Sequence, residues 1–127
     1  RQFRYADHRE LLEIPAGTVP NGKTPAAIAR SELLEEVGYR PARLRKLFTF
    51  YSTPGTTTER THLFYGEVDN RHKIAAGGGL DSEHEFIEVV ELPVARAIQF
   101  LRQGKILDAK TIIAFQWLAS RLGKSSQ

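Results

Sequence analysis

The stretch Glu32-Leu33-Leu34-Glu35-Glu36-Val37-Gly38 is the most informative part of the sequence, because it ends a well-bounded predicted helix with three carboxylates. Thr24 has the residue type of an N-cap, and Pro25 follows at the first helical position. Good helix formers continue to Val37, and Gly38 stands where a glycine commonly terminates a helix. The sequence therefore predicts a helix over residues 25–37.

The three glutamates of this predicted helix share one face. At about 100° per residue, Glu36 lies about 40° from Glu32, and Glu35 lies about 60° to the other side. Like charges at this spacing repel each other, and the helix dipole disfavours the two in the last turn by about 0.3–1 kcal/mol each. A divalent cation such as Mg²⁺, which prefers carboxylate oxygens, would relieve the repulsion. The alternative is a solvated acidic face, so the surrounding residues have to decide between the two.

Length and composition limit the class of protein. The 127 residues, 41% of them hydrophobic, suit a single compact domain, which we place at residues 1–122 with a disordered tail at 123–127. The formal charge of +3 is small and the Lys and Arg residues are spread along the chain, so no nucleic-acid partner is expected. The absence of Cys excludes disulfides, thiolate metal sites and thiol nucleophiles. No apolar run reaches the length of a membrane span, and we expect a cytoplasmic protein without a membrane partner.

Short apolar segments bounded by Gly, Pro, Asp or Asn predict four strands, at Glu10–Ile14, Leu44–Tyr51, His62–Val68 and Phe86–Leu92. Two further helices are predicted, one over residues 93–103 and one that follows an Asp108 N-cap and ends at Leu122. Strands mixed with three helices over this length indicate an α/β or α+β layered domain.

Around the acidic helix, the residues form a pattern that resembles the Nudix box, G-x5-E-x7-R-E-U-x-E-E-x-G-U, where U is an aliphatic or bulky apolar residue. The matching positions hold Gly17, Glu32, Leu33, Glu35, Glu36, Gly38 and Tyr39. Two positions depart from the box: Lys23 replaces its first Glu, and Ser31 replaces the Arg that helps to orient the glutamates in this family. Arg30 is one place away and, at about 100° per residue, points elsewhere. The box is therefore degenerate, but its metal-binding carboxylates are present.

Other segments resemble the ADP-ribose pyrophosphatases and GDP-mannose hydrolases of this family. They are Glu13–Gly17 (E-I-P-A-G), Ser52–Glu59 (S-T-P-G-T-T-T-E), the glycine-rich acidic run Gly77–Val89 and the D-A-K-T sequence of residues 108–111. Taken singly, the first two are ordinary turns and the third is a flexible surface loop. The position of Pro54, 16 residues after Gly38, favours the resemblance.

The resemblance implies a Nudix α/β/α sandwich with a mixed β-sheet, whose N-terminal strand or strands are absent from this chain. It also implies a role for three sets of residues. The implied metal ligands are Ala16 (through its carbonyl), Glu32, Glu36 and Glu85. The implied catalytic residues are Glu83, Glu85 and Glu35, with Glu83 or Glu85 as the general base. The implied substrate-binding residues are Arg4, Pro54, Gly55 and Glu59.

The implied activity is hydrolysis, dependent on Mg²⁺ or Mn²⁺, of the diphosphate bond in a nucleoside diphosphate sugar. The products would be a nucleoside monophosphate and a sugar phosphate, and the favoured substrate is ADP-ribose, ahead of GDP-mannose and ADP-glucose. The resemblance also implies a homodimer. The alternative is a Nudix domain that has lost turnover and acts as a nucleotide-sugar-binding or regulatory module, which Lys23 and Ser31 support.

Some further residues have the chemistry to bind a ligand, but also an ordinary structural interpretation. His8, His62, His72 and His84 have neither HExxH nor paired-ligand spacing, so a structural zinc is not expected. Arg9, like Arg4, could meet a phosphate, although exposed arginines are common. Phe50 or Tyr51 could stack on a base, but alternating aromatics in a strand more often lie in a core.

Overall fold

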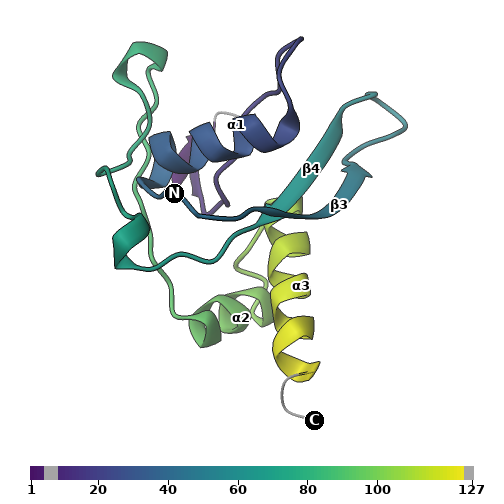
Figure 1. The fold of residues 1–127 in the computed structure, drawn as a ribbon. Helices are drawn as coiled ribbons and strands as arrows, with labels where there is room; N and C mark the ends of the chain where they lie inside the picture. Colours follow the sequence, from purple (N-terminus) through teal and green to yellow (C-terminus); the bar gives the residue numbers. More distant parts are fainter. Residues whose placement is uncertain (5–8, 125–127) are drawn as a thin grey trace. The chain divides into compact units, whose positions relative to one another are not determined.

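The computed structural model describes residues 1–4 and 9–124, without the side chain of Phe3. His8 and residues 125–127 of the expected tail lie outside the described residues. The chain divides into two compact units, one formed by Pro15–Val89 and one by Arg1–Ile14 together with Val90–Gln127. Figure 1 shows the helices and strands from which these units are built.

The unit Pro15–Val89 contains the acidic helix. Helix α1 (Pro25–Glu32) continues as the π-helical turn η1 (Leu33–Val37), so the predicted helix of residues 25–37 is confirmed. The Thr24 hydroxyl caps its first turn by accepting a hydrogen bond from the Ala27 amide at 3.2 Å. Gly38 ends it in the left-handed conformation, with φ of 79°.

The same unit contains a β-hairpin. Strand β3 (Arg45–Tyr51) pairs antiparallel with β4 (Arg60–Tyr65), and a bulge interrupts the ladder between Lys46 and Phe48. Helix α1 lies against β4 (Figure 1), in which Leu63 is only 5% exposed. Two short 3₁₀ turns follow β4, η2 (Asn70–His72) and η3 (Asp81–Glu83).

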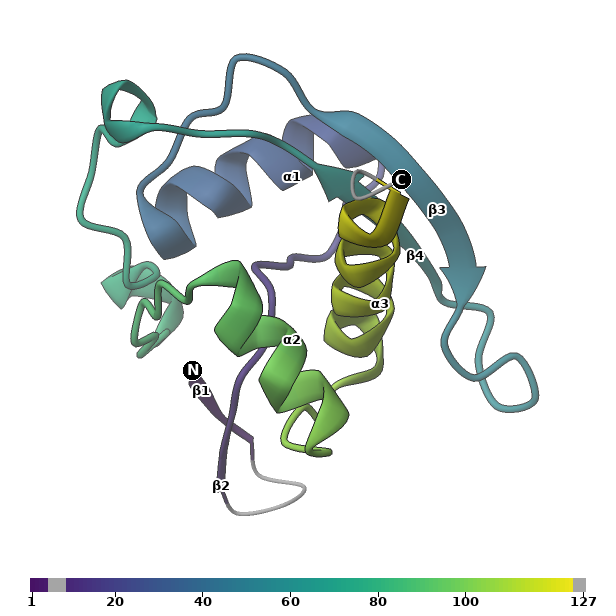
Figure 2. The same ribbon diagram turned by 90° about the horizontal axis from the view of Figure 1, so that it is seen from below.

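The other unit pairs two short strands and packs two helices together. Strand β1 (Gln2–Arg4) runs antiparallel to β2 (Arg9–Leu11), and helix α2 (Val94–Arg102) lies against α3 (Ala109–Lys124), as Figures 1 and 2 show. Asp108 accepts the Thr111 amide at 3.1 Å, which confirms it as the N-cap of α3. The most buried side chains of this unit are Ala97, Ile106 and Thr111.

The α/β class is confirmed, with differences in the strands. Residues 86–92, predicted as a strand, belong to no strand; the Ile87 amide instead donates to the Gly78 carbonyl at 3.1 Å. Strand β2 ends at Leu11, three residues before the predicted end at Ile14, because its partner β1 begins at Gln2, opposite Leu11. The described residues therefore form two separate two-stranded antiparallel sheets, and the expected mixed sheet is not seen among them.

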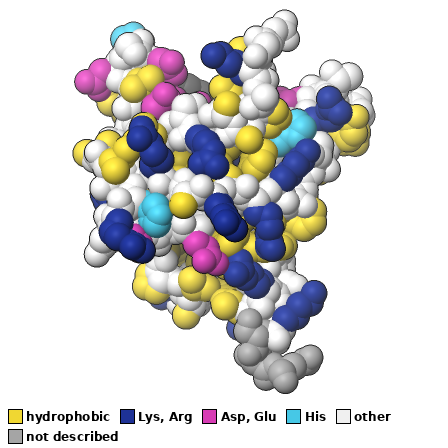
Figure 3. Space-filling model, in the orientation of Figure 1, with side chains coloured by type: hydrophobic (Ala, Val, Ile, Leu, Met, Phe, Trp, Pro, Cys, Tyr) yellow, Lys and Arg dark blue, Asp and Glu magenta, His cyan; other side chains and the backbone are white. Residues whose placement is uncertain are grey.

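The surface agrees with a dispersed charge pattern. On the face drawn in Figure 3, Lys and Arg side chains are spread widely, whereas Asp and Glu side chains gather over the loop that contains η3. That loop holds Asp81, Glu83 and Glu85. Within the described part of the chain, no helix combines the length and apolar character that crossing a membrane requires.

Candidate active site

The last turn of the acidic helix is a π-turn, which an α-helical spacing argument does not foresee. The Gly38 amide donates to the carbonyls of both Leu33 and Leu34, and the bond to Leu33, five residues back, is the one that defines a π-turn. A π-turn widens the helix and changes the angle between successive side chains, so the predicted angles around the helix do not apply to Glu35 and Glu36. Such turns are frequent at functional sites, and this one bears two of the predicted site residues.

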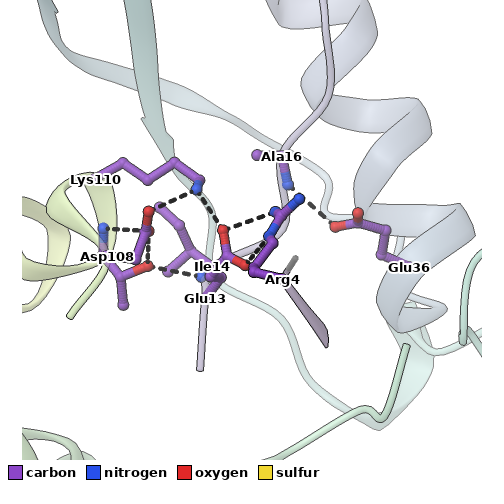
Figure 4. Close-up of polar contacts among 8 residues, drawn as sticks. Arg4, Glu13, Ile14, Ala16, Glu36, Asp108 and Lys110 are labelled. Atoms are coloured by element: carbon purple, nitrogen blue, oxygen red, sulfur yellow. Dashed lines mark hydrogen bonds and ion pairs between the residues drawn. The ribbon is translucent and has the colours of Figure 1, made fainter. Parts of the chain in front are cut away.

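Glu36 faces the segment that precedes α1. Its side chain is nearly buried, at 7% exposure for the residue, and its Oε2 accepts a hydrogen bond from the Ala16 amide at 3.0 Å (Figure 4). The structure thus brings together two predicted metal ligands, Ala16 and Glu36. The contact runs through the Ala16 N–H, whereas the predicted metal-binding group is the carbonyl of the same residue.

Glu32 lies against the same segment, one residue further along. A side chain on Gly17 would overlap the Glu32 carboxylate, which explains why glycine occupies this position of the box. Partial burial raises the pKa of Glu32, and the negative charges of Glu35, Glu85 and Glu83 raise it further. The helix and the acidic loop therefore bring their carboxylates within electrostatic reach of one another.

The acidic loop holds its two predicted catalytic residues differently. Glu83 is exposed in η3, while Glu85 is partly buried and its Oε2 accepts the Leu80 amide at 3.3 Å. His84 lies between them with φ of 54°, a left-handed conformation that is uncommon for a residue with a side chain. The chain reverses at His84, directly after η3, so that Glu83 is exposed whereas Glu85 is partly buried.

The donor set has the chemistry of a site for a hard divalent cation, although its side chains are not gathered around one point. All candidate ligands are oxygens, which Mg²⁺ and Mn²⁺ prefer. Burial is the first cause of the raised pKa of Glu32, and the neighbouring carboxylates add a repulsion that a cation would relieve. Among the residues that the structure describes, no three His, Asp or Glu side chains stand in a group that could hold a metal ion. Binding would therefore require carboxylate side chains to turn toward a shared cation.

Three of the predicted substrate-binding residues, Pro54, Gly55 and Glu59, lie in the β3–β4 loop of the same unit. Pro54 and Gly55 form an exposed turn at the tip of the β3–β4 hairpin, in which the Thr57 amide donates to the Thr53 carbonyl at 3.0 Å. Figures 1 and 2 both place this tip on the opposite side of its unit from the acidic loop. Glu59 is exposed beside the turn.

Arg4 belongs to the other unit and is bound within it. Its guanidinium donates from Nε and Nη2 to the two carboxylate oxygens of Glu13 at 2.7 and 2.8 Å (Figure 4). The Glu13 side chain is 9% exposed and also accepts the Lys110 ammonium at 2.8 Å. A two-point ion pair of this kind holds Arg4 in place as a structural partner, and phosphate binding by Arg4 would have to compete with it.

Sequence reasoning missed this ion-pair network, which ties the first segment of the chain to α3. Lys110 Nζ bridges Glu13 and Asp108, and the second Asp108 oxygen accepts the Thr111 hydroxyl at 2.6 Å. The Thr111 hydroxyl in turn accepts the Ile14 amide at 3.0 Å. The signal was the D-A-K-T sequence at a helix start, because an Asp N-cap accepts a backbone amide two or three residues on, which brings its carboxylate to Thr111.

The departures from the box also have a structural account. The Ser31 hydroxyl donates to the Ile28 carbonyl at 3.0 Å, within its own helix. The Arg30 guanidinium donates to the Pro41 carbonyl at 3.0 Å, so Arg30 is used to fasten the chain after the helix. Neither contact reaches the glutamates, which confirms that Arg30 does not take the place of the missing Arg.

Comparison with known proteins defines the family. A family model described as the NUDIX domain matches residues 1–114, and the chain therefore belongs to the Nudix family. It is similar to a GDP-mannose pyrophosphatase of Citrobacter koseri, 39% identical over 126 residues that cover 94% of this chain and 64% of that protein. Proteins of the same name from Escherichia coli O139:H28 and Shigella flexneri serotype 5b are each 38% identical over 124 residues, covering 93% of this chain and 63% of theirs. The chain thus spans slightly less than two thirds of the length of these relatives.

Proposed function

We propose that this protein hydrolyses the diphosphate bond of a nucleoside diphosphate sugar in a reaction that depends on Mg²⁺ or Mn²⁺. The observation that carries the proposal is the set of carboxylates on the helix and the acidic loop: Glu36 is nearly buried and accepts the Ala16 amide at 3.0 Å, and the Glu32 carboxylate lies against Gly17. Burial, and then the charges of Glu35, Glu85 and Glu83, raise the pKa of Glu32. Membership of the Nudix family and the names of the similar proteins support the same chemistry.

The first substrate to test is GDP-mannose, because the similar proteins are named GDP-mannose pyrophosphatases. The sequence prediction favoured ADP-ribose, with GDP-mannose and ADP-glucose as the other possible substrates. These substrates share the linkage to be cleaved and differ only in base and sugar. The expected products are a nucleoside monophosphate and a sugar phosphate.

In the proposed mechanism, the residues that would hold the cation are Glu32, Glu36, Glu85 and, through its carbonyl, Ala16. A bound divalent cation would neutralise the diphosphate oxygens and lower the pKa of a water molecule. Glu83 is exposed in a turn beside these residues and can accept the proton of the attacking water; Glu85 is the alternative base. Glu36 keeps the Ala16 peptide against the helix through its 3.0 Å hydrogen bond.

The test is release of nucleoside monophosphate from GDP-mannose, ADP-ribose and ADP-glucose by the intact protein, with Mg²⁺ and with EDTA. Glu36→Gln and Glu83→Gln remove one charge each and are expected to abolish most of the turnover. Glu67→Gln is the matched control, because Glu67 is exposed and contacts Tyr65, two residues away on the hairpin. Turnover that survives EDTA, or that persists in both site variants, would contradict the proposal.

A second candidate function is binding without turnover, as a nucleotide-sugar sensor or regulatory module. The specific observation is that Ser31 bonds within its own helix and Arg30 bonds to Pro41, so no arginine from either position orients the glutamates. Calorimetric binding of GDP-mannose with no product formed would favour this function. Gain of turnover in Ser31→Arg would then identify Ser31 as the cause.

We also propose that the intact protein acts as a homodimer in the cytoplasm. The tip of the β3–β4 hairpin lies on the opposite side of its unit from the acidic loop, so a role of this tip in substrate binding would require it to reach the site of a second copy. Light scattering coupled to size-exclusion chromatography measures the mass directly, and a monomer at micromolar concentration would contradict this part of the proposal.

A further inference from the structure

The triple glycine before the acidic loop is an ordered cap on the helix that bears the glutamates. The Gly78 amide donates to the Glu36 carbonyl at 2.8 Å, and the Gly79 amide donates to the Glu35 carbonyl at 3.0 Å. Carbonyls in the last turn of a helix lack partners within the helix, so an outside segment has to supply them. Here the loop supplies them, which corrects the interpretation of this run as a flexible surface loop.

All three glycines need the left-handed half of conformational space. Their φ values are 77°, 102° and 86° for Gly77, Gly78 and Gly79. A Cβ on Gly77 would stand 2.6 Å from the Glu36 carbonyl oxygen, so this glycine allows the loop to approach the helix backbone. The cap and its close approach to the helix therefore both depend on glycine.

Gly79 differs from Gly78 in the atoms that a side chain at its position would meet. A Cβ on Gly79 would lie 2.6 Å from Glu85 Cβ and 2.8 Å from Glu85 Oε2. A Cβ on Gly78 would meet nothing closer than the Ile87 carbonyl oxygen at 3.6 Å. The same substitution at these adjacent glycines, both of positive φ, thus displaces Glu85 at Gly79 but makes only an ordinary van der Waals contact at Gly78.

The acidic loop closes on itself around this point. The Leu80 amide donates to Glu85 Oε2 at 3.3 Å, the Glu85 amide donates to the Leu80 carbonyl at 3.3 Å, and the Ile87 amide donates to the Gly78 carbonyl at 3.1 Å. Glu85 is therefore folded back over Gly79, and Gly79 is itself bonded to the carbonyl of Glu35. The chain of contacts runs from the helix through Gly79 to the Glu85 carboxylate.

We propose that Gly79 is a positioning residue, which sets the Glu85 carboxylate relative to the glutamate helix by leaving space for it while its own amide caps the helix. This inference rests on the proposed function, since it assigns Glu85 a role in binding the cation. Gly79 acts through Glu85, because glycine has no side chain that could contact the substrate or the metal.

The experiment measures Mn²⁺ affinity of the intact protein by electron paramagnetic resonance, with no substrate present, together with kcat and KM on the substrate that the wild type turns over. The variants are Gly79→Ala, Gly78→Ala, Glu85→Gln and the double variant Gly79→Ala/Glu85→Gln. Gly22→Ala is the conformational control, because Gly22 has φ of 82° with nothing within 4 Å of an added Cβ. Thermal melts establish that each variant is folded.

Gly79→Ala is expected to lower both the Mn²⁺ affinity and kcat by about 10–100-fold, the range typical of residues that orient a metal ligand, with KM less affected. Gly78→Ala is expected to lose about as much stability as Gly79→Ala. Its Mn²⁺ affinity, however, is expected to stay within about threefold of that of the wild type. In the Glu85→Gln background, Gly79→Ala is expected to cause no further loss, because residues that act as a unit are not additive.

Equal losses of Mn²⁺ affinity in Gly78→Ala and Gly79→Ala would overturn the inference, as would a full additional loss in the double variant. If Gly79→Ala does not fold, Glu85→Asp replaces it: the carboxylate is then one methylene short of the Leu80 amide, and unchanged Mn²⁺ affinity would overturn the inference. A wild type that binds no Mn²⁺ and hydrolyses none of the three substrates would overturn the proposed function itself, and this inference with it.

Discussion

Replacing Thr111 with valine removes one hydroxyl from a fully buried position while keeping the shape of the side chain. Thr111 is 0% exposed, and its hydroxyl donates to Asp108 Oδ2 at 2.6 Å and accepts the Ile14 amide at 3.0 Å. Ile14 is the last residue of the N-terminal segment of its unit, so this contact joins the end of that segment to the first turn of α3. The substitution therefore tests whether the D-A-K-T segment anchors the chain.

The expected cost follows from the two lost hydrogen bonds. A hydrogen bond to a charged group contributes about 1.5–3 kcal/mol, and a buried N–H left without a partner costs about 1–3 kcal/mol. Ile14 is only partly buried, so water replaces some of the second loss. We expect the free energy of unfolding to fall by roughly 2–4 kcal/mol. At a slope of about 2 kcal/mol per molar urea, the unfolding midpoint falls by about 1–2 M.

Urea unfolding of the intact protein, followed by circular dichroism, measures this difference. Thr111→Ser keeps the hydroxyl and loses a methyl group, so it should cost only about 1 kcal/mol. Thr49→Val makes the same change at an exposed hydroxyl that lies 3.1 Å from His62 Nδ1, and should stay within about 0.5 kcal/mol of the wild type. If Thr111→Val is as stable as Thr49→Val, the hydroxyl does not anchor Ile14 and the argument fails.

Three further predictions concern the ion pair, the helix end and Arg30. Burial alone would raise the pKa of Glu13 and lower that of Lys110, but the hydrogen bonds and opposite charges of their partners outweigh it. The pKa of Glu13 therefore falls below 4.5, and the pKa of Lys110 rises above 10.5. The stability from Glu13 is then present above pH 4.5 and lost as pH falls through its folded pKa; that from Lys110 is present below pH 10.5 and lost as pH rises through its folded pKa. Lys110→Met should therefore lower the unfolding free energy by about 1.5–3 kcal/mol at pH 7, with a smaller gap in acid, and a gap constant down to pH 3 would refute this. Gly38→Ala should destabilise far more than Gly22→Ala, because both have φ near 80° but a Cβ on Gly38 would overlap the Ala75 carbonyl oxygen; equal melting temperatures would contradict it. Arg30→Met should cost about 0.5–1.5 kcal/mol through the lost Pro41 contact and leave kcat unchanged, whereas a large fall in kcat would mean that Arg30 orients the glutamates after all.

The acidic helix is the part of the fold that local chemistry predicted best. Thr24, Pro25 and Gly38 act within a few residues of their own positions, so their effect can be predicted from the local sequence alone. The strand predicted at residues 86–92 is absent, and local chemistry could not foresee its absence. Its apolar alternation suits a ladder, but the Ile87 amide found a partner in Gly78, far enough along the chain that only folding brings them together.

For the candidate site as well, some features could be predicted from the sequence and others only from the tertiary structure. The sequence by itself determined the family resemblance, the carboxylate inventory and the absence of an arginine at position 31, because these depend on residue type and spacing alone. Only the tertiary structure decided that Glu36 is turned to the Ala16 amide, that Glu85 folds over Gly79, and that Arg4 is bound by Glu13. It also decided that the β3–β4 hairpin tip lies on the opposite side of its unit from the acidic loop. The physical reason is that a side chain's charge and capping preference are local properties, whereas its partner is whichever group the packed chain delivers within hydrogen-bond distance.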